Sequence, residues 1–188
     1  MKTDELIRAL SADRLAPVTP IHRSIGIALL GGSALAATLF VFTIGIRANA
    51  MESLAEWRFV MKFVVTLSLV APAIALLLRL ARPDASGVPW WLLLLAPLAL
   101  LAGVATELMS VPVASWPRRL VGHNALYCLT LIPLLSLAPL VCVFAALKRG
   151  APAQPRLAGA IGGMACSGIA ATLYAMHCQD DSPLFVAA

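Results

Sequence analysis

Long apolar stretches constrain this chain more than any other feature, because five of them fill most of its 188 residues. A helix needs about 20 consecutive apolar residues to cross the hydrocarbon core of a bilayer, and each stretch is close to that length. The predicted spans are 25–46, 59–78, 90–109, 125–147 and 157–176. The connectors between them are too short to fold as domains. The sequence therefore predicts an all-α, polytopic transmembrane helix bundle with five complete spans.

Composition supports a bundle in lipid. The chain is 61% hydrophobic and 12% charged, with a mean hydropathy of +0.90, whereas a soluble domain is about 25% charged. The apolar runs are continuous, unlike the alternating strands of a membrane barrel. We expect a polar tail at residues 1–24 and a transmembrane bundle at 25–188. Residues 182–188 look like the start of a truncated sixth span, since so short a piece cannot cross a bilayer.

The placement of lysine and arginine predicts the orientation, because these residues favour the cytoplasmic side. With the N-terminus inside, nine cytoplasmic cations face five outer ones. The inner set is Lys2, Arg8, Arg14, Arg23, Arg79, Arg82, Lys148, Arg149 and Arg156, and the outer set is Arg47, Arg58, Lys62, Arg118 and Arg119. The net charge of +5 is thus a topology signal, and no direct contact with nucleic acid is expected.

Four cysteines differ in predicted depth. Cys128 lies just inside the outer end of the fourth span, and Cys178 lies just past the outer end of the fifth. Two antiparallel helices would bring both thiols near one face, where a disulfide or a soft metal ion would join them. Metal sites usually need more than two protein ligands, and His177 is the third candidate. Cys142 and Cys166 sit deeper and are expected to pack as small hydrophobes.

No motif indicates catalysis. The chain lacks H-E-x-x-H, a nucleophile elbow and a phosphate-binding glycine loop, so we expect it not to be an enzyme. Glu107 lies near the outer end of the third span, where we expect it to reach the interface. It has no evident acidic or histidine companion at depth, which disfavours a proton relay. A small transporter or channel-like protein stays open as the alternative function.

Small residues and prolines predict where helices approach closely. Gly32 and Ala36 in the first span, and Gly159 and Gly163 in the fifth, have the four-residue spacing that lets backbones meet in lipid. The fourth span contains Pro133 and Pro139, each of which removes a backbone donor and favours a bend.

The N-terminal tail predicts a short helix that needs a partner. Asp4 and Glu5 are acids that suit a helix N-terminus. Leu6 and Leu10 fall on one face with Ile7 beside them. An isolated helix this short is marginal in water, and its mixed charge suits a protein groove better than a lipid surface.

Three segments resemble the NrsF-type anti-sigma factors, a family of bacterial membrane regulators. They are MKTDELI at 1–7, CLTLIPLLS at 128–136 and HCQDDSPLF at 177–185. The resemblance spans essentially the whole chain and implies six membrane helices in the inner membrane. It also implies a cytoplasmic N-terminus that holds a sigma factor, and a functional pair of cysteines that match Cys128 and Cys178.

The resulting hypothesis is a membrane-bound anti-sigma factor. Its tail, through Asp4, Glu5, Leu6, Ile7 and Leu10, would sequester an extracytoplasmic-function sigma factor of the sigma-F type. A redox or heavy-metal signal at the cysteine pair would release the sigma factor. Membrane lipid is the other expected partner, and no cofactor is expected apart from a heavy or soft metal ion as the signal.

Overall fold

The computed structural model describes residues 3–5, 7–8, 20–82, 87–150 and 152–188. This part of the chain is helical and contains no strand, which confirms the predicted all-α class. The α-helices are α2 (Ile21–Thr43), α3 (Ala50–Ser53), α4 (Trp57–Leu80), α5 (Leu95–Ser110), α6 (Trp116–Val121), α7 (Ala125–Leu147), α8 (Pro155–Ala175) and α9 (Pro183–Ala187). Two 3-10 helices, η1 (Trp90–Leu94) and η2 (Val113–Ser115), precede α5 and α6.

Five helical segments are long and apolar enough to cross a membrane, as the sequence predicts. The first helix begins at Ile21, directly after Pro20, rather than at residue 25. The third combines η1 and α5. Residues 182–188, expected to begin a further span, contain the short helix α9, which Pro183 starts and the Ser182 hydroxyl caps by accepting from the Leu184 amide at 3.3 Å.

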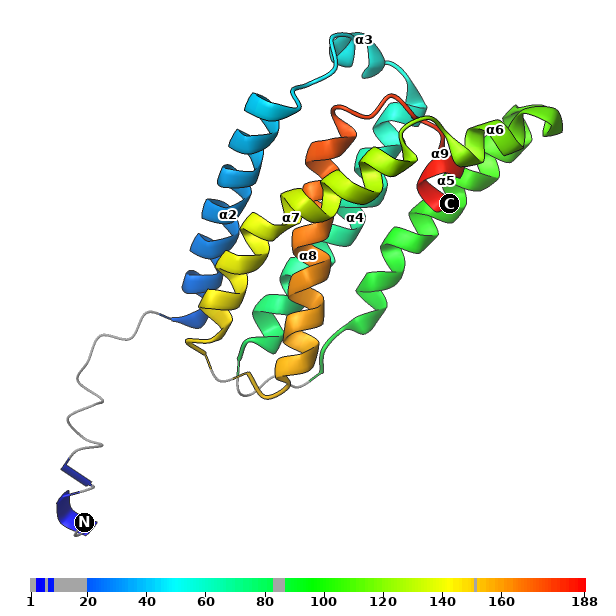
Figure 1. Ribbon diagram of the computed structural model, residues 1–188. Helices are drawn as coiled ribbons and strands as arrows, with labels where there is room; N and C mark the ends of the chain where they lie inside the picture. Colours follow the sequence, from blue (N-terminus) through cyan, green and yellow to red (C-terminus); the bar gives the residue numbers. More distant parts are fainter. Residues whose placement is uncertain (1–2, 6, 9–19, 83–86, 151) are drawn as a thin grey trace.

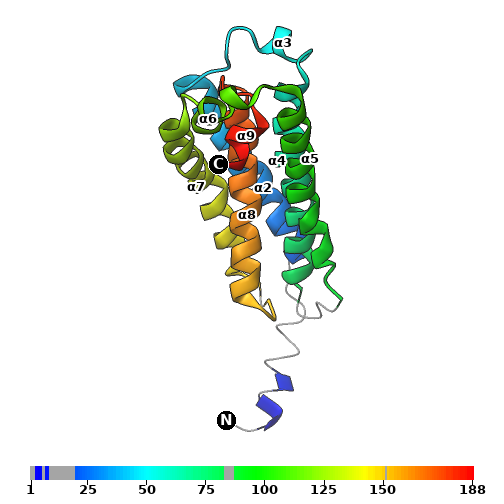
Figure 2. The same ribbon diagram turned by 90° about the vertical axis from the view of Figure 1, so that its right-hand side faces the viewer.

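The long helices pack around α8. Helix α8 contacts α4 and α7, α2 packs on the other side of α7, and α5 packs on α4 (Figure 1). Helices α2, α5 and α8 finish at one end of the bundle, where α4 and α7 begin. We call this the polar end. Figure 2 shows α3, α6 and α9 gathered there.

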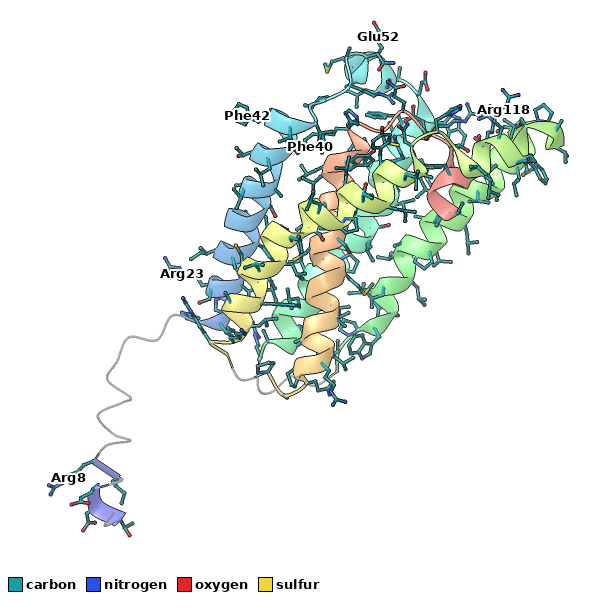
Figure 3. The ribbon with its side chains drawn as sticks, viewed as in Figure 1. Arg8, Arg23, Phe40, Phe42, Glu52 and Arg118 are labelled. Atoms are coloured by element: carbon teal, nitrogen blue, oxygen red, sulfur yellow. The ribbon has the colours of Figure 1, made fainter. Side chains whose placement is uncertain are left out.

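Two apolar clusters fill the bundle. One lies away from the polar end and is built around fully buried residues such as Ile25, Leu77 and Val143. The other lies toward the polar end and contains Phe40 and Cys178. Helix α2 shows how strongly side chains divide between the two environments, because Phe40 is 1% exposed whereas Phe42 is 84% exposed (Figure 3).

Glycines mark the closest helix contacts. A Cβ atom on Gly32 of α2 would lie 2.4 Å from the Cα of Pro139 in α7, which confirms the tight approach predicted for Gly32. Helix α7 runs unbroken through Pro133 and Pro139. In α8, a Cβ on Gly168 would lie 2.7 Å from Val70, whereas one on Gly159 or Gly163 would meet nothing within 4 Å. The Gly159–Gly163 pair therefore makes no close packing contact among the described residues.

Candidate functional site

The two cysteines selected by depth lie together at the polar end. Cys128 is in the first turn of α7, and Cys178 follows the end of α8. Their sulfur atoms are 3.9 Å apart, and both cysteines are free. Cys178 is 4% exposed and packs within the same apolar cluster as Tyr174. The prediction that both thiols reach one face is confirmed, and the pair is close enough for direct thiol chemistry.

The surroundings of Cys178 favour its thiolate. A hydrogen bond from the Cys128 thiol, with help from the backbone of Asp180 and the charge of Lys62, lowers the pKa of Cys178 to about 7 against the opposing effect of burial. Thiolate is the reactive form of cysteine. Of the two thiols, Cys178 is the one whose surroundings favour the thiolate.

Two cations that share one carboxylate hold the backbone beside Cys178. Arg47 and Lys62 donate to the Cys178 carbonyl oxygen at 3.2 and 2.9 Å. The same two cations pair with Asp181, at 3.0 Å from Arg47 Nη1 and 2.6 Å from Lys62 Nζ. Arg47 and Lys62 are 8% and 5% exposed. We call Arg47, Lys62 and Asp181 the lysine triad.

Asp180 ties Cys178 to the helix that carries Cys128. Its Oδ2 accepts from the backbone amides of His123 and Asn124 at 2.9 and 2.7 Å, directly before α7 begins. Burial opposes the charge of this carboxylate, but the two amides outweigh it and lower the pKa of Asp180. The bonds fix the start of α7 against residues 178–180 and so set the distance between the thiols.

Glu107 lies near the C-terminal end of α5, at the polar end, and is buried within the bundle. It is 0% exposed. Its carboxylate accepts from Arg58 Nε at 2.6 Å and Arg119 Nη1 at 2.7 Å, and from the Ser182 hydroxyl at 3.2 Å. We call Glu107, Arg58 and Arg119 the glutamate triad. Its companions are arginines from α4 and α6, which the sequence did not indicate.

His177 is not placed as a third metal ligand. Its Nδ1 lies 3.1 Å from the Gly45 carbonyl oxygen, and its ring lies 5.9 Å from that of Tyr174. Among the described residues, no three His, Cys, Asp or Glu side chains form a group that could hold a metal ion.

The other predicted site residues lie elsewhere. Cys166 is fully buried in the cluster away from the polar end, and Cys142 is partly buried in α7, as expected for packing residues. In the tail, residues 3–5 and 7–8 are helical and Ile7 is 58% exposed. Leu6 and Leu10 lie outside the described residues.

Sequence reasoning missed the charges that surround the thiols. Lys62 and Arg47 had been interpreted only as topology signals. Asp180 and Asp181 were part of the segment 177–185 but had no assigned role. The signal that was available is the charge of Lys62 itself, because a lysine one turn inside an apolar span needs a partner.

Comparison with known proteins identifies the family. A family model described as "Negative regulator of sigma F", NrsF, matches residues 10–188. The chain belongs to the NrsF family. It is similar to the anti-sigma-F factor NrsF of Caulobacter vibrioides, with 31% identity over 100% of this chain and 89% of that protein. It is also similar to the probable anti-sigma-F factor NrsF of Azospira oryzae, with 30% identity over 99% of this chain and 88% of that protein.

No solved structure matches this chain. The NrsF family match covers both thiols, both triads and the whole bundle, whereas residues 1–9 lie outside it.

Proposed function

We propose that this chain is a membrane-bound anti-sigma factor of the bacterial inner membrane. The observation that carries the proposal is its match, over nearly the whole chain, to relatives named as anti-sigma-F factors. The partner is an extracytoplasmic-function sigma factor of the sigma-F type. The N-terminus lies in the cytoplasm, where the sigma factor is found, and the polar end faces the opposite side of the membrane.

The tail is the proposed sigma-binding element. Asp4 and Glu5 supply charge, and Leu6, Ile7 and Leu10 supply an apolar face for a groove in the sigma factor. The exposed Ile7 side chain supports this assignment, since an apolar residue on a short helix gains stability only by docking.

The proposed signal is oxidation of the thiol pair by a peroxide. The Cys178 thiolate attacks one peroxide oxygen, the O–O bond breaks, and hydroxide leaves to give a sulfenic acid. The Cys128 sulfur then attacks Cys178, a disulfide forms, and water leaves. Two electrons pass from the thiols to the peroxide. A soft metal ion bound by the two sulfurs is the alternative signal, and it would need a ligand beyond the residues that now surround them.

The disulfide would change the packing of α7. Its sulfurs must approach from 3.9 Å to about 2.05 Å, which pulls the first turn of α7 toward the segment after α8. Farther along α7, Pro139 packs against Gly32 of α2. Beyond the end of α7, Gly150 lies against Ile21, the first residue of α2. Because the tail leads directly into α2, a shift of α7 reaches the sigma-binding element through these contacts.

The test is retention of the sigma factor by the full chain in lipid nanodiscs. Reduced protein is expected to retain a purified sigma factor of the sigma-F type, and peroxide is expected to release it. Cys128→Ser and Cys178→Ser should each abolish release, whereas Cys142→Ser should release normally. Retention that peroxide does not alter would refute the thiol signal, and failure of the reduced protein to bind would refute the anti-sigma function.

The transporter alternative finds less support. A transport path needs polar groups near the middle of the membrane. The charged residues of the long helices all lie within about two turns of a helix end: Arg23, Arg58, Lys62, Arg79, Glu107 and Arg156.

A further inference from the structure

We propose that a pocket at the polar end binds a phosphate group, with Arg118, Arg58 and Arg119 as its ligands. The pocket has a volume of about 460 Å³ and opens beside α6 and the segment after α8. Neither thiol lines it. This site is distinct from the thiol pair and does not depend on the anti-sigma function.

The first argument is an excess of positive charge beside the pocket. In the glutamate triad, one fully buried carboxylate lies between two arginines. In the lysine triad, one carboxylate lies between two cations that are nearly buried. Together with Arg118, Glu56 and Asp180, which also line the pocket, the two triads hold five cations and four carboxylates, so one positive charge is left over. An anion in the pocket would supply the missing charge.

The second argument is the number of free donors. A guanidinium has five N–H donors in a planar fork that suits phosphate oxygens. Arg58 and Arg119 each use one nitrogen on Glu107. Their side chains remain 29% and 35% exposed, and both residues line the pocket. The Arg118 guanidinium has no hydrogen bond or ion pair with any residue that the structure describes. Glu107 thus orients two arginines, and Arg118 completes the set.

The acids that line the pocket compete little for these donors. Asp181 is paired with Arg47 and Lys62. Asp180 is occupied by two backbone amides and lies 3.6 Å from His123 Nδ1. Glu56 is exposed, so water screens its charge. The carboxylates that line the pocket are therefore already paired or screened, which leaves the arginine donors available to an anion.

The position of the pocket makes phosphate the expected anion. Trp57 begins α4 and Trp116 begins α6, on the two elements that supply the arginines. Tryptophan side chains favour the headgroup level of a bilayer, where phosphate diesters are abundant. The same site would bind a free phosphate ester from the aqueous side, because the guanidinium groups hydrogen-bond only to the phosphate oxygens.

The test is a thermal-unfolding titration of the purified full chain in a phosphate-free maltoside detergent. The three probes are a short-chain phosphatidylglycerol, glycerol phosphate and an alkyl glucoside that lacks phosphate. Binding to the folded state raises the unfolding midpoint. Both phosphate compounds are expected to raise it, and the glucoside is not. A response to the lipid alone identifies a headgroup as the source, and an equal response to glycerol phosphate identifies a free ester.

Arg118→Gln is the decisive variant, because no described residue pairs with this side chain. It is expected to leave the ligand-free midpoint unchanged and to weaken phosphate binding about tenfold or more, as for loss of a hydrogen bond to a charged group. Arg23→Gln is the matched control. Arg23 is an exposed arginine at the other end of the bundle (Figure 3), and its replacement should not alter binding.

Two results would overturn the proposal. One is an unchanged midpoint with both phosphate compounds. The other is equal phosphate affinity in Arg118→Gln and the unmodified protein. If Arg118→Gln unfolds, Arg118→Lys replaces it, since lysine keeps the charge but lacks the planar fork. Weaker binding by Arg118→Lys supports the site, and unchanged binding contradicts a role for the fork.

Discussion

At one end of the bundle Ile25, Leu77 and Val143 are fully buried among apolar neighbours, whereas at the polar end Glu107 and Lys62 are almost equally buried among charges. The apolar end needs only complementary shape, which many combinations of Leu, Ile, Val and Ala provide. The polar end needs a particular partner at a particular atom. A chemical change to one group there disturbs several bonds, so this end is suited to sensing.

The largest expected effect is at the glutamate triad. Glu107→Ala removes the carboxylate from two arginines and leaves them without their counter-ion. Breaking a buried ion pair in this way costs about 3–5 kcal/mol, which should be measured as the loss of unfolding free energy in mixed detergent micelles. The control is Glu52→Ala, an exposed acid of α3 (Figure 3). Equal stability of the two variants would show that the polar end does not depend on its charges.

A smaller loss is expected where α2 and α7 meet. Gly32→Ala places a Cβ 2.4 Å from the Pro139 Cα. This backbone atom cannot move aside by a rotamer change, as a side-chain atom could. Overpacking of this kind typically costs about 1–3 kcal/mol. Gly31→Ala is the matched control, because a Cβ there meets nothing within 4 Å. If both variants unfold at the same midpoint, the close approach of these helices is wrong.

Lys62 connects the buried charges of the polar end to the thiol pair, because it contacts both Asp181 and the Cys178 carbonyl oxygen. The pKa of Cys178 is lowered to about 7 mainly by the hydrogen bond from Cys128, and the positive charge that Lys62→Met removes contributes to the lowering. The pKa is therefore expected to rise, and the pH of half-maximal alkylation of Cys178 should move upward. The extent of Cys178 alkylation at each pH is measured by mass spectrometry after treatment with a small thiol reagent. Lys148→Met, an exposed lysine at the end of α7, should leave the profile unchanged.

The same lowered pKa predicts how stability varies with pH. The unfolded thiol, with its higher pKa, holds its proton where the folded thiol has lost it. Stability from Cys178 is therefore fully present above the unfolded pKa and declines as pH falls through about 7. The free energy of unfolding should rise between about pH 7 and pH 9, and this rise should be smaller in Cys178→Ser. An identical slope in the variant would assign the pH dependence to other groups.

The smallest effect is expected from the thiol at the apolar end. Cys166→Ser places a hydroxyl in a fully buried apolar site, at a cost of about 1 kcal/mol if the hydroxyl bonds to the preceding turn. The response of sigma release to peroxide should not change. An altered response would mean that both ends of the bundle take part in thiol chemistry.

Much of the architecture was accessible from the sequence. Span length depends on the local run of apolar residues, so the five long helices lie close to the predicted positions. The depths of Cys128 and Cys178 follow from the same count, and alternating spans place both at one end. The four-residue spacing of small residues predicted the close contact at Gly32, but the same spacing at Gly159 and Gly163 predicted one that the structure does not show, because spacing does not tell which helix face meets a neighbour.

The pairing of the charges depended on tertiary structure. Arg47 and Asp181 are separated by 134 positions, and Arg58 and Glu107 by 49. The charge of Lys62 in an apolar span was a signal that it needs a partner, but the sequence does not say which partners Lys62 and Glu107 have. The rotation of each helix about its axis, the turn before α7 and the folding back of residues 177–188 decide that. Apolar burial in lipid is satisfied by any partner of suitable shape, whereas an ion pair requires two specific atoms within a few ångströms.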